Sequence, residues 1–183
     1  MKTDDVAEPI RTLRERLVHE NAWVRVYDDE VQFSDGSIGS FYHSRWKSPH
    51  GVAMVPVLDD TVLLLRHYRY GEKAWSLEIP QGFGTAGSSP SNDALRELRE
   101  ETGLSARRIT PLLTLGLDYR TYVFVTEDHG SGLPNTGGLE ASEQVAEFVR
   151  LPVADIGPDT FERIGVHDPV TLSALLTFRL RRL

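Results

Sequence analysis

The chain has 183 residues and contains no cysteine. It therefore has no disulfide bond, no thiolate metal ligand and no cysteine nucleophile, as is typical of proteins in a reducing compartment. No apolar run approaches the ~20 residues that a membrane-spanning helix needs. The first residues also lack the apolar core of a signal peptide. We therefore expect a cytoplasmic protein that does not bind a membrane.

Positive charge is scarce as well. The 20 Lys and Arg residues are outnumbered by 27 Asp and Glu residues, so the formal net charge is −7. Nucleic-acid backbones are held by clustered Lys and Arg side chains, so this balance argues against a nucleic-acid partner. A small phosphorylated ligand is still compatible with it, because a bound metal ion can supply local positive charge.

The first part of the chain predicts a small antiparallel β region. Residues 1–20 are polar, and we expect an irregular arm there. Alternating runs at 23–33 and 38–46 flank a Ser-Asp-Gly-Ser turn and predict a hairpin. A Ser-Pro-His-Gly segment follows, and we divide the chain there into a hairpin region, 1–47, and a main domain, 48–183. A lone hairpin is marginally stable, so we expect the first region to join two chains in a homodimer.

The main domain predicts strands, a helix, more strands and a final helix. The first helix should begin after Ser89 and Pro90 and end at Gly103, since these residue types favour the two ends of a helix. The last helix should follow Asp168 and run over 170–181. Between them lies a long glycine-bearing loop, and loops of that length are more often functional than merely connecting. Strands are expected over 52–58, 61–69, 75–80, 109–117, 119–127 and 145–151.

Three carboxylates crowd the first of these helices. Residues three and four apart on a helix are neighbours, so Glu97 and Glu101 share a face and Glu100 lies beside them. A divalent cation would relieve their repulsion, because hard cations prefer carboxylate oxygens. The alternative is a charged surface helix whose carboxylates pair with Arg96 and Arg99.

The spacing around these carboxylates favours the first interpretation. Residues 82–104, GFGTAGSSPSNDALRELREETGL, resemble the Nudix box, GX5EX7REUXEEXGU, in which U is a bulky aliphatic residue. Every fixed position matches except one, where Ser88 replaces the glutamate. The preceding residues 77–81 resemble the strand that enters the box in ADP-ribose pyrophosphatases. This resemblance implies an α/β (α+β) fold, a Nudix α/β/α sandwich with a mixed β-sheet, plus the small N-terminal antiparallel β region.

The resemblance also implies an activity. Family members hydrolyse the pyrophosphate of a nucleoside diphosphate linked to another moiety, by attack of water on phosphorus, with Mg²⁺ or Mn²⁺. The implied metal ligands are Glu97, Glu100, Glu101 and the backbone carbonyl of Gln81, and we count Glu97 and Glu101 as catalytic. ADP-ribose pyrophosphatases take their general base from a loop after the box. Here Glu143 and Glu140 are the candidates, and the position of Glu143 favours it.

Substrate contacts follow from the same resemblance. Arg69 matches an arginine that binds substrate phosphate, and Glu78 lies in the segment that enters the box. Trp23 and Phe41 lie in the region whose aromatic rings stack on adenine in the pyrophosphatases. The alternatives are a structural salt bridge for Arg69 and core packing for the two aromatic residues.

Two departures keep other functions open. Serine cannot neutralise a guanidinium, so Ser88 leaves Arg96 to pair with Glu100. Arg120 stands where ADP-ribose pyrophosphatases have a proline. The chain could instead be a sensor domain that binds such a ligand without cleaving it, or a hydrolase of another diphosphate such as a sugar nucleotide or a prenyl diphosphate.

Overall fold

The computed structural model describes residues 8–130, 134 and 145–182. The chain forms two compact units, Met1–Ser48 and Pro49–Leu183, which are described separately below. No helix in the described part of the chain is long and apolar enough to cross a membrane.

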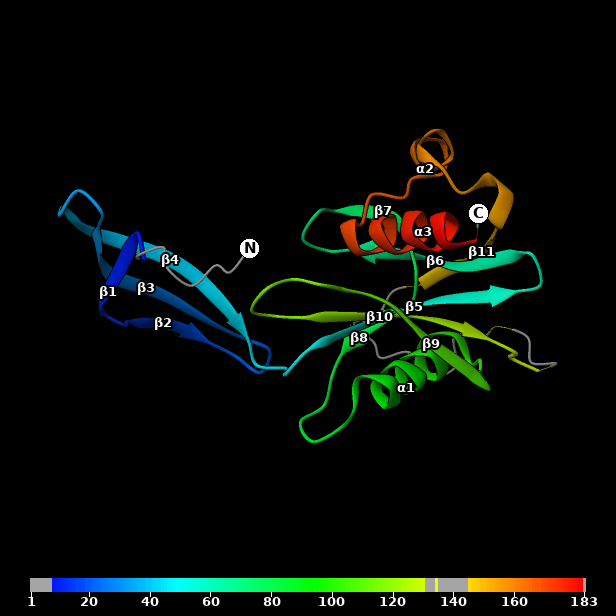
Figure 1. Ribbon diagram of the computed structural model, residues 1–183, viewed down its shortest axis with the longest axis horizontal. Helices are drawn as coiled ribbons and strands as arrows, with labels where there is room; N and C mark the ends of the chain where they lie inside the picture. The colour runs from blue at the N-terminus through cyan, green and yellow to red at the C-terminus, as the bar shows by residue number, and fades with distance from the viewer. Residues whose placement is uncertain (1–7, 131–133, 135–144, 183) are drawn as a thin grey trace. The chain divides into compact units, whose positions relative to one another are not determined.

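The N-terminal unit is a four-stranded antiparallel sheet built around one long strand (Figure 1). This strand, β3 (Val24–Phe33), pairs along one edge with β4 (Ile38–Trp46). Its other edge pairs with β1 (Ile10–Arg14) and β2 (Leu17–Glu20). The predicted irregular arm is therefore wrong for these two strands. Their side chains are mostly exposed, so backbone pairing with the open edge of β3 accounts for them better than burial of apolar side chains.

The second unit contains a seven-stranded mixed sheet, in which β5 and β10 are parallel and the other neighbours are antiparallel. Its strands are β5 (Gly51–Leu58), β6 (Thr61–Arg69), β7 (Ala74–Glu78), β8 (Gln81–Phe83), β9 (Arg108–Leu115), β10 (Thr121–Glu127) and β11 (Val145–Pro152). The sequence analysis did not predict β8, because three residues are too few to show a periodicity.

Helices cover both faces of this sheet, so the predicted α/β/α sandwich is confirmed (Figure 1). On one face lies α1 (Pro90–Thr102). On the other lie α3 (Pro169–Arg181) and the shorter α2 (Pro158–Ile164), which follows a 3₁₀ turn at Val153–Asp155. The short α2 was not predicted, since it has only seven residues.

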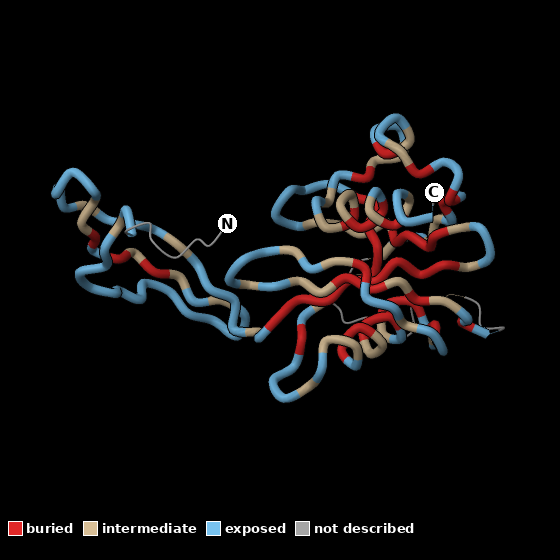
Figure 2. The backbone as a smooth tube through the Cα atoms, viewed as in Figure 1, coloured by how far each residue is buried: buried red, intermediate tan, exposed pale blue. Residues whose placement is uncertain are grey.

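Two apolar clusters hold the layers together, one on each side of the buried strands that Figure 2 shows in red. Successive residues of a strand point to opposite faces, so Met54 packs towards Ala94 and Leu98 of α1, whereas Val55 belongs to the cluster that contains Leu175 of α3. Burial of such side chains stabilises each layer by about 1.5–3 kcal/mol per large residue. The sheet therefore fixes the position of α1.

The predicted ends of α1 are confirmed. The Ser89 hydroxyl accepts a hydrogen bond from the Asn92 backbone N–H at 3.3 Å, and Pro90 opens the helix. Gly103 ends it with a left-handed φ of 70°, a conformation that glycine adopts without steric cost. Ala94 and Leu98 of α1 face the core. Glu97 and Glu101 are buried on the same side of the helix.

Candidate active site

Two buried carboxylates of α1 contact the strand that precedes the helix. The Glu101 side chain is in a residue only 3% exposed, and its Oε2 accepts the Gln81 backbone N–H at 3.0 Å. The Glu97 carboxylate packs against Gly82, where a Cβ atom would lie 2.2 Å from the carboxyl carbon. A buried carboxylate is costly unless it is paired or binds a metal, so this arrangement needs polar or cationic partners.

Arg96 links Glu100, the third predicted carboxylate ligand on α1, to Glu97. Its Nη1 donates to Glu100 at 2.7 Å, as expected for a chain that lacks the box glutamate at position 88. Its Nη2 contacts Glu97 at 2.8 Å and donates to the Phe83 carbonyl at 2.8 Å. Partial burial of the guanidinium lowers the pKa of Arg96, but the nearby carboxylates of Glu97 and Glu100 together have the larger effect, so the pKa is raised. One guanidinium therefore connects two helix carboxylates with the end of β8.

A second polar group adjoins Gln81. Glu78 is 2% exposed, and its carboxylate accepts hydrogen bonds from the Nε of Arg69 at 2.9 Å and from the Gln81 side chain at 2.8 Å. The hydrogen bond with Glu78 is the main cause that raises the pKa of Arg69, and the charges of Asp168 and Glu101 act in the same direction. The chain of contacts thus runs continuously from Arg69 to Glu101.

The donor set fits a hard divalent cation. Carboxylate oxygens are the ligands that Mg²⁺ prefers, and Glu97 and Glu101 are buried on one face of α1 with the half-exposed Glu100 beside them. In residues 8–130, 134 and 145–182, however, no three acidic or histidine side chains converge as a ready-made metal site. Arg96 forms ion pairs with both Glu97 and Glu100, so these two carboxylates are directed to the guanidinium and not to a common centre.

The remaining predicted site residues lie outside the described residues or in the N-terminal unit. Glu140 and Glu143 lie outside the described residues. Trp23 and Phe41 belong to the N-terminal unit, where both side chains are exposed, so they do not form its core.

The structure adds polar residues that the sequence analysis did not select. The Asp168 carboxylate accepts hydrogen bonds from the backbone N–H and the hydroxyl of Thr171, both at 2.7 Å. The Thr171 hydroxyl in turn accepts the Ile79 backbone N–H at 3.1 Å. The start of α3 is thereby tied to the segment that enters the box. The sequence signal for this contact is the position of Asp168, directly before the predicted last helix.

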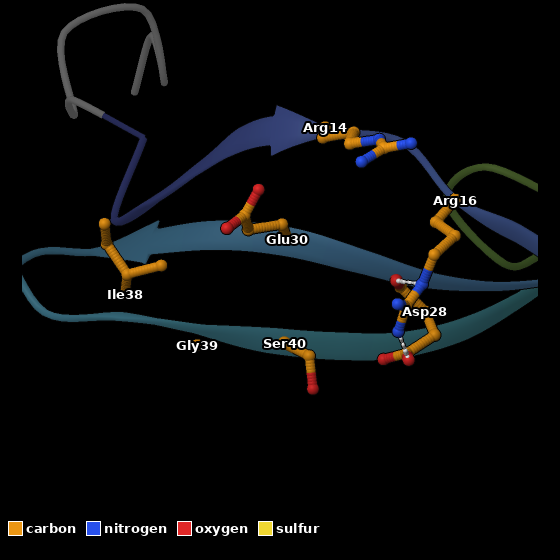
Figure 3. A pocket seen from close by; sticks show the side chains of 7 residues that line it. All are labelled: Arg14, Arg16, Asp28, Glu30, Ile38, Gly39 and Ser40. Atoms are coloured by element: carbon orange, nitrogen blue, oxygen red, sulfur yellow. Dashed lines mark hydrogen bonds and ion pairs between the residues drawn. The ribbon is translucent and has the colours of Figure 1, made fainter.

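Two hollows have no box carboxylate among their lining residues. One, of about 670 Å³, is a largely apolar groove beside β9 and β10. The other, of about 350 Å³, lies on the N-terminal sheet, where charges of both signs line it (Figure 3). Its lining residues are Arg14, Arg16, Asp28, Glu30, Ile38, Gly39 and Ser40. Neither hollow includes a predicted site residue.

Two family models match the chain, one in each part. A family model described as NUDIX domain matches residues 47–170, and one described as nucleoside diphosphate sugar hydrolase N-terminal domain matches residues 10–44. The ADP-sugar pyrophosphatase of Mus musculus is 33% identical over 179 residues, which cover 87% of this chain and 81% of the relative.

Two bacterial relatives match over shorter stretches. The ADP compounds hydrolase NudE of Escherichia coli is 32% identical over 88 residues, 48% of this chain and 47% of the relative. The ADP-ribose pyrophosphatase of Bacillus subtilis is 27% identical over 103 residues, 56% of this chain and 55% of the relative. The chain thus spans about half the length of these two relatives.

A solved structure of an ADP compounds hydrolase superposes with a TM-score of 0.79. The sequences are 24% identical, and the match covers 97% of this chain and 96% of the other. At that identity the likeness establishes the fold.

Proposed function

The chain belongs to the NUDIX domain family, and on that basis we propose that it hydrolyses the pyrophosphate bond of a nucleoside diphosphate joined to another moiety. ADP-ribose and ADP-sugars are the substrates we favour. The observation that carries the proposal is the burial of Glu97 and Glu101 on one face of α1, against the backbone of Gln81 and Gly82.

Pyrophosphate hydrolysis needs compensation of negative charge and an activated water molecule. We assign Glu97, Glu100, Glu101 and the Gln81 carbonyl to a divalent cation, Mg²⁺ or Mn²⁺. When bound, such a cation supplies positive charge to the pyrophosphate and lowers the pKa of a water molecule. Glu143 is our candidate for the general base that takes the proton of the attacking water.

Arg69 is suited to bind a phosphate group of the substrate. Glu78 engages its Nε and Nη2 atoms, and Nη1, which has no hydrogen-bond partner among the described residues, can donate to a phosphate oxygen. Guanidinium groups form strong charge-assisted bonds with phosphate. The buried Glu78, itself held by Gln81, orients Arg69 for this contact.

The N-terminal unit completes the proposal. Within its described residues the buried apolar side chains are those of Tyr27 and Val31, whereas Ile38 and Tyr42 are exposed. We infer a homodimer in which this sheet packs against a second chain, and in which Trp23 and Phe41 stack on the adenine. Absence of cysteine supports a cytoplasmic location.

A second function is favoured by one residue. Ser88 replaces a box glutamate, and a domain that binds the ligand without cleaving it would tolerate that change. Arg120 likewise favours a substrate other than ADP-ribose, such as another sugar nucleotide or a prenyl diphosphate.

Incubation of the purified protein with Mg²⁺ and a panel of diphosphates in ¹⁸O-labelled water tests these functions. The panel contains ADP-ribose, an ADP-sugar, a UDP-sugar and a prenyl diphosphate, with EDTA as control. We expect AMP and a sugar phosphate from an ADP derivative, with ¹⁸O in one phosphate product. Tight binding of an ADP derivative without any product would favour the sensor function instead.

A further inference from the structure

A buried pair of residues contacts the loop 84–88 between β8 and α1, outside the group of predicted metal ligands. His50 immediately precedes β5, and Asp93 belongs to the first turn of α1. Their side chains, both buried, meet at 3.0 Å between His50 Nε2 and Asp93 Oδ2. The ring of Tyr122 packs edge-on against His50 at 5.7 Å. The pair therefore connects the sheet with the box helix.

The same carboxylate holds the loop. The Thr85 backbone N–H donates to Asp93 Oδ2 at 3.2 Å, and the Gly84 N–H donates to the His50 carbonyl at 2.8 Å. A Cβ atom on Gly84 would lie 2.2 Å from His50 Nε2, so the imidazole ring packs directly on the loop backbone. Strand, loop and helix thus meet at one carboxylate.

The charge of Asp93 is maintained in this position. Burial opposes ionisation, but hydrogen bonds from Thr85, Ser88 and His50 outweigh it and lower the pKa of Asp93. An ionised carboxylate only accepts hydrogen bonds, so the His50 Nε2 must carry the proton that it shares. Asp93 Oδ1 faces Arg96 Nη2 at 3.7 Å, and the first turn of a helix favours a negative charge.

Strand β8, which leads directly into this loop, is itself in contact with the box carboxylates. Gly82 packs on Glu97, and the Phe83 carbonyl accepts from Arg96, which also pairs with Glu97 and Glu100. Two residues after Phe83, the Thr85 backbone N–H donates a hydrogen bond to Asp93. A shift of the loop at Thr85 would therefore displace the groups that orient Glu97.

We propose that Asp93 and His50 are positioning residues, which hold the loop 84–88 at the end of β8 and thereby fix Glu97 for metal binding in a chain whose residue 88 is an uncharged serine. The proposal rests on the proposed function for its catalytic consequence, but the anchoring itself does not depend on turnover. Ser88, Thr85 and Arg96 all direct polar groups to the one Asp93 carboxylate.

Hydrogen exchange of the loop amides, together with Mn²⁺ affinity, tests this proposal without any requirement for hydrolysis. Asp93→Asn should accelerate exchange at Gly84 and Thr85 at least tenfold and weaken Mn²⁺ binding, whereas the amides of β10 should exchange as in the wild type. Asp159→Asn, an exposed first-turn acid of α2, is the matched control and should change neither measurement.

Two further variants separate anchoring from general destabilisation. His50→Ala removes the partner on the sheet and should give the same local acceleration. Ser88→Asp combined with Asp93→Asn returns a carboxylate to the loop and should recover Mn²⁺ affinity. Unchanged loop exchange in Asp93→Asn, or uniform acceleration over the whole second unit in both single variants, would overturn the proposal. If the wild type cleaves no diphosphate, the exchange result still decides whether this pair anchors the loop.

Discussion

Gly82 and Glu97 are packed so closely that a Cβ atom on Gly82 would lie 2.4 Å from each carboxylate oxygen. The first residue of the box therefore needs to be glycine for space, because the helix carboxylate occupies the position of its side chain. Glu97 lies three residues after Ala94, whose burial sets the rotation of α1. The position of Glu97 is therefore set both by the space at Gly82 and by the buried face of α1.

Gly82→Ala should accordingly displace Glu97 and reduce metal-dependent turnover at least tenfold, with weaker Mn²⁺ binding. Gly71→Ala is the control, since a Cβ atom there meets nothing within 4 Å. Steady-state kinetics and titration with Mn²⁺ measure the two effects. Equal activity of the two variants would show that the contact has no role in metal binding.

Arg69→Lys should raise KM for the diphosphate about tenfold with a smaller change in kcat. Lysine keeps the charge beside the buried Glu78, but it loses the planar fork that can serve Glu78 and a phosphate together. Arg66→Lys, on the same strand and paired with the exposed Glu147, is the control. If KM did not change, Arg69 would be a structural partner of Glu78 alone.

His67 should make the protein less stable in mild acid. Burial lowers its pKa, and the charge of Arg69 acts in the same direction while Glu78 opposes it. A histidine in the unfolded chain takes up a proton near pH ~6.5, so the stability of the folded state falls as the pH drops below that value, and it stops falling only below the lower pKa of the folded state. Thermal unfolding from pH 7 to pH 5 should show a smaller loss in His67→Gln. The exposed His167→Gln should keep the wild-type slope, and a wild-type slope in His67→Gln would contradict the assignment.

The proposed homodimer depends on the exposed face of β4. Ile38 and Tyr42 are four residues apart on the strand, so they point to the same face, and both are exposed. The double variant Ile38→Glu/Tyr42→Glu should sediment as a monomer at micromolar concentration. Leu117→Glu, at a residue 96% exposed in the second unit, should leave the dimer intact. A monomeric wild type would exclude the dimer.

Much of the second unit could be predicted from local patterns. The long strands alternate or run apolar, and the ends of α1 are marked by Ser89, Pro90 and Gly103. The polar strands β1 and β2 could not be predicted in this way, because their position depends on the unpaired edge of β3. The three residues of β8 are likewise recruited by pairing with β5.

The candidate site was predictable only where residues are close in sequence. Glu97, Glu100 and Glu101 share a helix, so spacing alone places them together. His50 and Asp93 are 43 residues apart, and neither belongs to a fixed position of the box. Their contact follows from the packing of α1 on β5, which no local pattern records.

The most direct test of the account is the Mg²⁺-dependent turnover of Glu97→Gln and Glu101→Gln on the diphosphate that the wild type cleaves. Both substitutions remove a carboxylate charge and keep the side-chain volume. Each should lower turnover by orders of magnitude while circular dichroism shows a folded protein, and the exposed Glu162→Gln on α2 should match the wild type. Near wild-type turnover of either variant at saturating Mg²⁺ would contradict the assignment of these two carboxylates to the metal.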